Sequence, residues 1–219
     1  MRYYSYISDA KLDMLYEQIP PKLLDRIAAE LKLDIKVVSV SLKNDPSETT
    51  RYGKLNVVEN YIERHFDVGT VAEPTPWFRG HLNMRSGIYG DYPHSLLYFS
   101  GRQEGVLVAL IGSVHHLVGN SAAPPDIPVP YSRLPALFDL LRRSQPGGGS
   151  QRTDEDEDKR ALSEVVEFAQ ALPGVREPCE FLARRLLHGP VTGSQPEASR
   201  PEAKAILLGT PLYVALAGD

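Results

Sequence analysis

The stretch that most constrains the fold runs from Trp77 to Gly119, because it divides into three consecutive β-strands. Phe78 to Ser86 alternates between polar residues and apolar or small ones, which is the pattern of a strand with two different faces. Ser95 to Gly101 and Val106 to Val118 have the apolar content of two further strands. The turn sequence from Gly101 to Gly105 predicts a hairpin, so we expect the second and third strands to pair antiparallel.

Helices and further strands are expected on both sides of this central meander. Apolar residues at helical spacing predict helices beginning at Asp9, Pro21, Ser47, Pro135 and Lys159, with Asp9 as the cap of the first. Enrichment in tyrosine or β-branched residues predicts short strands at Arg2–Ser8, Ile35–Leu42 and Val68–Glu73. The segment Cys179–Leu187 fits either a strand or a helix, and the proline before it favours a strand. Ala203–Ala217 is predicted to form one or two strands hinged at Gly209.

These elements predict an α+β fold, with a largely antiparallel sheet whose central strand meander is packed by several amphipathic helices. The roughly 60 C-terminal residues are too few to form a core of their own, so their strand should join the same sheet. We therefore expect residues 1–219 to form a single domain. The segment at about 145–158 is rich in glycine, serine and charged residues, and this composition predicts a disordered internal loop.

Composition excludes some classes of function. The net charge is -4, which argues against the basic stripe of a nucleic-acid-binding surface. Cys179 is the single cysteine, so no internal disulfide and no thiolate zinc site can form. The first ten residues lack the apolar core of a signal peptide, and Val106–Ile111 is far too short to span a bilayer. We expect a cytoplasmic protein without a membrane partner, and the sequence does not predict its oligomeric state.

The polar face of the first central strand is the main candidate site. Arg79, His81, Asn83 and Arg85 alternate with apolar or small residues and should share one face. Arginine side chains suit a carboxylate or a phosphate, because the guanidinium fork matches the two oxygens of either group. We therefore predict that a small anionic or polar molecule binds there, with Trp77 as a wall of the site or a core residue.

Other interpretations of the same residues stay open. In an enzyme, His81 or His115 would act as a general acid–base, and Ser113 would be a nucleophile if a base and an oxyanion hole lay beside it. In an interaction protein, the polar face would dock a partner. In the simplest case the face only meets water. No carboxylate accompanies these residues, so we predict no metal site, and no phosphate-loop or dinucleotide motif indicates a cofactor.

Three stretches carry a resemblance to a known family: YYSYISDAKLDMLYEQIP at the start, YFSG followed by LIGSVHHLVG in the middle, and LLGTPLYVALA at the end. The chain resembles a family of uncharacterised proteins from actinobacteria, which shares the N-terminal SYISDAKLDML-like and central GSxHHLxG motifs. These stretches cover about a fifth of the chain but span its full length. The resemblance implies a bacterial cytoplasmic setting, and it transfers no activity or catalytic residue.

Overall fold

The computed structural model describes residues 2–33, 48–89, 96–119, 166, 169, 172–190 and 203–218. The predicted strand at Ile35–Leu42, the predicted helix from Pro135 and the predicted loop at 145–158 lie outside these ranges. The helices are α1 (Asp9–Gln18), α2 (Pro21–Glu30), α4 (Glu48–His65) and the short 3₁₀ helix η1 (Val114–His116). The strands are β1 (Tyr3–Ile7), β2 (Val68–Gly69), β3 (Trp77–Tyr89), β4 (Leu96–Gln103), β5 (Val106–Ser113), β6 (Glu177–Pro190) and β7 (Ala205–Leu216).

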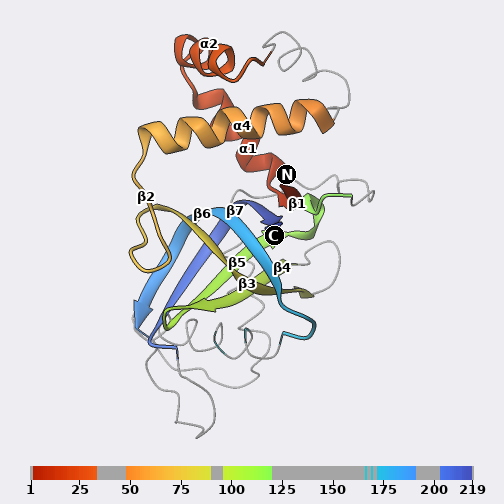
Figure 1. Ribbon diagram of the computed structural model, residues 1–219, viewed down its shortest axis with the longest axis vertical. Coiled ribbons are helices and arrows are strands. Elements are labelled where there is room, and N and C mark those ends of the chain that lie inside the picture. Colours follow the sequence, from red (N-terminus) through yellow and green to blue (C-terminus); the bar gives the residue numbers. More distant parts are fainter. Residues whose placement is uncertain are drawn as a thin grey trace, which may run out of the picture.

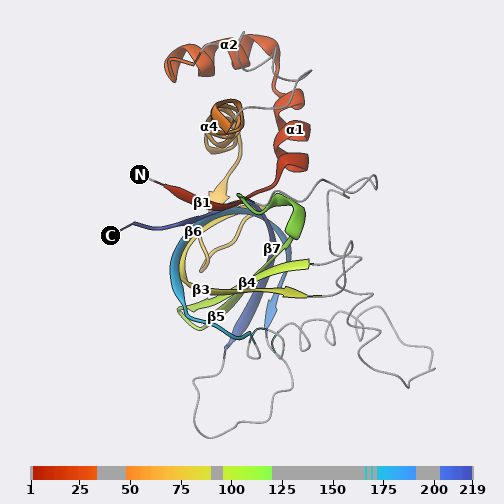
Figure 2. The ribbon, with the colours of Figure 1, turned by 90° about the vertical axis from the view of Figure 1, so that its right-hand side faces the viewer.

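Five of the strands close into a barrel, in the order β3-β4-β5-β7-β6 and back to β3 (Figures 1 and 2). The long strand β3 makes closure possible because it changes partner along its length. Trp77 to Met84 pair with β6, and Met84 to Tyr89 pair with β4. β5 and β7 run parallel, and the other four pairings of the barrel are antiparallel. Outside the barrel, β1 pairs with β7 and the short β2 pairs with β3.

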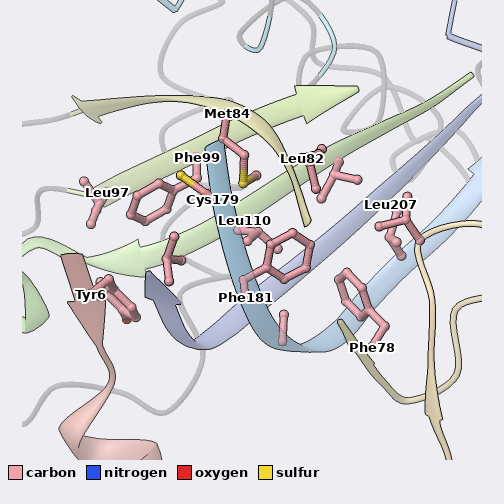
Figure 3. Close-up of a cluster of buried hydrophobic side chains, with 14 of the residues drawn as sticks. Tyr6, Phe78, Leu82, Met84, Leu97, Phe99, Leu110, Cys179, Phe181 and Leu207 are labelled. Carbon is pink, nitrogen blue, oxygen red and sulfur yellow. The ribbon is translucent and has the colours of Figure 1, made fainter. Parts of the chain in front are cut away.

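The interior of the barrel is filled by apolar side chains from all five of its strands (Figure 3). The rings of Phe78 and Phe181 meet edge to face, with their centroids 5.7 Å apart. Tyr6 belongs to the same cluster, and its ring lies edge to face with Phe99. Cys179 also faces this interior, where burial and the nearby charge of Glu177 raise the pKa of its thiol to about 11. The thiol is therefore neutral near physiological pH, which makes it a packing residue rather than a nucleophile.

A helical layer covers one side of the barrel (Figures 1 and 2). Helices α1 and α4 pack against each other and, together with the outward side chains of β6 and β7, enclose a second apolar cluster that includes Leu12, Leu55 and Tyr213. Trp77 is buried in this cluster. α2 lies on α4 at the far side from the strands.

A third apolar cluster lies on the outer face of β4, β5 and β7, away from the helical layer. Its strand residues include Tyr98, Leu107 and Ile206, and they are covered by Val166 and Leu172. Val166 and Ala169 are helical, as the predicted helix from Lys159 requires. Each side of these strands is therefore apolar, one facing the barrel interior and the other facing this segment, which explains why their sequences are continuously hydrophobic.

The α+β class agrees with the sequence, as do the hairpin of β4 and β5 and the strand at β6. The C-terminal strand joins the same sheet as predicted, and it is one continuous strand through Gly209. Barrel closure and the parallel pairing of β5 with β7 were not predicted. The predicted third strand was too long, because β5 ends at Ser113 and the chain continues into η1.

The start of the chain differs in detail from what local sequence patterns predict. Strict alternation would place Tyr4 and Tyr6 on one face of the strand, but the register of β1 shifts between them, so Tyr6 enters the barrel cluster and Tyr4 packs against the helical layer. Ser8, not Asp9, is the N-cap of α1. Lys11, in the first turn of α1, is only 8% exposed, and its Nζ donates to Ser8 Oγ at 3.2 Å.

Candidate functional site

The exchange of partners along β3 divides its polar face into two parts. Arg79, His81 and Asn83 lie on the part that pairs with β6, and all three are exposed. Arg85 lies beyond the exchange, opposite Ser100 of β4. Six residues of strand separate Arg79 from Arg85, which amounts to roughly 20 Å. The two arginines therefore share a face but are too far apart to hold one small anion together.

Arg79 already has a partner. Its Nη2 forms an ion pair with Glu63 of α4, and both side chains are largely exposed. His81 lies directly opposite Glu180 of β6, whose carboxylate pairs with Arg2 at 2.5 Å. The charge of Arg79 is thus balanced by Glu63 of α4, and the charge of Glu180 by Arg2. Ion pairs at an exposed surface contribute little to stability.

A second group of polar side chains surrounds Arg85, and we call it the β3–β4 polar patch: Asn83, Arg85, Ser100 and Arg102. Ser100 is buried and pairs with Arg85. Arg102 lies two residues beyond Ser100 and pairs with Leu107, an outer-face residue, so it faces the same side. On neighbouring strands such diagonal side chains start about 7–8 Å apart. Two guanidinium groups, one amide and one hydroxyl make this patch rich in hydrogen-bond donors.

Arg85 is the exceptional member of the patch. It is only partly exposed, and its Nη1 donates to the backbone carbonyl of Leu172 at 3.0 Å. Its Nε is shielded from solvent and has no hydrogen-bond partner. Within the described ranges no carboxylate lies at ion-pair distance from it. A partly buried charge without a counterion is costly, and such a group in a folded protein calls for an explanation.

The remaining predicted site residues lie elsewhere. Ser113 is buried at the end of β5, where its Oγ accepts a weak bond from the backbone N–H of His115 at 3.4 Å and caps η1. Ser113 pairs with Leu96, which pairs with Tyr89. Tyr89 is eight residues along β3 from His81, roughly 25 Å. The structure therefore does not bring Ser113 and His115 together with His81.

Sequence reasoning missed a polar cluster at the start of α1. Asp9 accepts two hydrogen bonds from Arg51 of α4, at 2.7 and 2.8 Å, and lies 3.4 Å from Nδ1 of His116 in η1. Burial alone would raise the pKa of Asp9. The hydrogen bond with His116 and the charges of Arg51 and His116 outweigh burial and hold that pKa below its usual range. No periodic signal in the sequence links these positions, because they meet only when α1, α4 and η1 pack together.

A second missed cluster ties β1 to the helical layer. Glu59 of α4 is buried and accepts hydrogen bonds from Arg2 at 2.8 and 3.0 Å and from the hydroxyl of Tyr213 at 2.8 Å. Burial and the Glu59 carboxylate together raise the pKa of Tyr213. Through these hydrogen bonds Glu59 links α4 to Arg2, just before β1, and to Tyr213 of β7.

The described residues contain no group of three or more His, Cys, Asp or Glu side chains arranged to hold a metal ion. None of their helices combines the length and the apolar character needed to cross a bilayer.

The fold and the patch together define an α+β protein in which a closed five-stranded barrel carries a helical layer on one side and a donor-rich patch on another. Residues 2–218 match the family model described as a family of unknown function, DUF7019, and the chain belongs to that family. No curated protein matches the chain. No solved structure matches it either.

Proposed function

We propose that this protein binds a small oxyanion, a carboxylate or a phosphate, at the β3–β4 polar patch. The observation that carries the proposal is the state of Arg85: a partly buried guanidinium with one hydrogen bond, one unsatisfied N–H and no ion pair among the described residues. A bound oxyanion would supply the missing charge and the missing acceptor. Ser100 and Asn83 offer neutral donors beside it.

The topology of the barrel supports a binding role. Its strand order, with the third and fifth barrel strands parallel and all other pairs antiparallel, is that of the OB-fold, a Greek-key barrel whose second and third strands and adjoining loops form the ligand face. Here those two strands are β4 and β5, and the patch borders that face. One fold can carry many functions, so the proposed site depends on its own residues.

The nature of the ligand follows from what surrounds the patch. Apart from Ser100, Arg102 and the buried Ser113, the outer face of β4 and β5 is apolar, and Val166 and Leu172 pack on it. Its described residues therefore offer no open row of aromatic and basic side chains for a nucleic-acid strand. The net charge of the chain does not oppose a small anion at the barrel. Within 67–89, 96–119, 172–190 and 203–218 there are seven Arg and Lys against five Asp and Glu.

A binding protein is supported better than an enzyme or a docking module. His81 lies four residues along β3 from Arg85, roughly 13 Å, and Ser113 lies at the end of β5, so neither of these two predicted catalytic side chains accompanies Arg85. A docking face usually has exposed aromatic residues at its centre. The exposed large apolar side chains among the described residues are Tyr3, Phe66, Ile88 and Val175, and none belongs to the row from Arg79 to Arg85.

The test compares two arginines of the same strand. Calorimetric titration with inorganic phosphate and with citrate should show binding to the wild type. Arg85→Ala should weaken that binding about tenfold or more, since a charge-assisted hydrogen bond contributes about 1.5–3 kcal/mol. Arg79→Ala, which removes the same group from an exposed position already paired with Glu63, should leave the affinity unchanged. Equal effects of the two substitutions, or no binding by the wild type, would contradict the proposal.

A further inference from the structure

Leu172 performs two tasks at once in this structure. Its side chain is 1% exposed and packs in the apolar cluster on the outer face of the barrel. Its backbone carbonyl accepts the hydrogen bond from Nη1 of Arg85. Leu172 therefore packs against the barrel with its side chain and holds the guanidinium of the proposed anion site with its backbone carbonyl.

The bond to Leu172 determines which part of Arg85 remains for a ligand. A guanidinium carries five N–H donors in a rigid plane. The carbonyl of Leu172 uses a donor on Nη1, which leaves the edge formed by Nε and Nη2. That edge presents two parallel N–H groups, the arrangement that binds both oxygens of one carboxylate or phosphate. Nε is shielded from solvent and has no hydrogen-bond partner among the described residues, so an oxyanion that displaces the groups covering this edge would supply the acceptor that Nε lacks.

We infer that Leu172 is a positioning residue of the anion site, and that anion binding and the packing of Leu172 in the outer apolar cluster are energetically coupled. The inference rests on the proposed function and adds the regulation of the same site. Coupling between two events is reciprocal: if the packed Leu172 orients Arg85 for the anion, the anion must hold Leu172 in place by the same factor. Typical couplings change affinity by fivefold or more.

The first test loosens the packing around Leu172 without changing Arg85 or Leu172. Val166 is 6% exposed and belongs to the same apolar cluster as Leu172, so Val166→Ala leaves a gap in that cluster and weakens its packing. We expect the affinity for inorganic phosphate, measured by calorimetric titration, to fall about fivefold or more. The control is Val58→Ala, the same truncation at a fully buried site of the helical layer, which should leave the affinity unchanged.

The second test measures the reciprocal effect, that of the anion on the backbone next to Leu172, and it needs no destabilised variant. In hydrogen–deuterium exchange of the wild type, saturating phosphate should slow exchange of the backbone amides between Leu172 and Glu177, apart from Pro173, which has none. In Arg85→Lys, the planar guanidinium is replaced by an ammonium group. An ammonium cannot hold the carbonyl of Leu172 and both oxygens of an anion in one fixed plane. Phosphate should then give no added protection.

The outcomes separate the two proposals. If phosphate binds in an Arg85-dependent manner but Val166→Ala keeps the wild-type affinity and exchange is unchanged, the coupling is wrong and the proposed function stands. If the wild type shows no Arg85-dependent binding of phosphate or citrate, both are overturned. A loss of affinity in Val58→Ala equal to that in Val166→Ala would assign the effect to general destabilisation and would also overturn the coupling.

Discussion

At the scale of single residues, the sequence predicted the side of the strand to which a side chain points better than the residue with which it interacts. Strand alternation correctly indicated that Arg79, His81, Asn83 and Arg85 point to the same side of β3, with Phe78 and Met84 on the other. It could not indicate that β3 changes partner at Met84. That exchange gives Arg79 a carboxylate from α4 and leaves Arg85 without one, because the acidic partners come from elements that the local pattern does not describe.

The cluster around Asp9 leads to a prediction about pH. Because the pKa of Asp9 in the folded protein lies below its ordinary value of 3.8, its ion pairs stabilise the fold above that pH, and this contribution is lost as the pH falls through the lowered pKa. Asp9→Asn should therefore cost about 1 kcal/mol at pH 7, a modest value because the carboxylate is 44% exposed.

Urea denaturation at pH 7 and at pH 3 measures this effect. The difference between wild type and Asp9→Asn should shrink at pH 3. Asp25→Asn, at an exposed position of α2, serves as the control and should change the free energy of unfolding by less than about 0.5 kcal/mol at either pH. A gap between wild type and Asp9→Asn that stays constant from pH 7 to pH 3 would mean that the carboxylate does not stabilise the fold through its charge.

At the scale of elements, the sequence predicted the strands of the barrel but not its closure. Local alternation and turn residues suffice to recognise β3, β4 and β5 and the hairpin between the last two. Closure depends on the parallel pairing of β5 with β7, in which Val106 lies opposite Ala205. Such long-range parallel contacts leave no local pattern, so an open meander and a closed barrel look alike in the sequence.

Glycines mark the places where the barrel wall and the interior rings meet. A Cβ added to Gly80 on β3 would lie 2.6 Å from the ring of Phe181 and 2.8 Å from a methyl group of Val71. Gly80→Ala should therefore destabilise the protein by about 1–3 kcal/mol through overpacking. Phe181→Leu in the same chain should recover part of that loss. Thermal and urea unfolding of the two single variants and the double variant form a cycle, and purely additive effects would show that the ring is not the obstacle.

At the scale of the whole molecule, the prediction that the C-terminal strand joins the main sheet is confirmed. β7 pairs with β1, β5 and β6. We therefore expect one cooperative unit, and a chain truncated after Gly189 should lose its cooperative transition altogether, as followed by circular dichroism and calorimetry. A sharp transition retained by the shortened chain would mean that the helical layer or the remaining strands fold independently.

The position of β7 also has a consequence for how the protein is made. Residues 205–216 form β7, which pairs with β1, β5 and β6. These residues leave the ribosome after every other described element, so the three strands lack this partner until then. Until then, the nascent chain exposes unpaired strand edges that can join other chains. Loop-closure entropy makes contacts of such long sequence separation slow to form. Pairing of β7 is therefore the step at which the chain either completes the described sheet or depends on a chaperone to shield those edges.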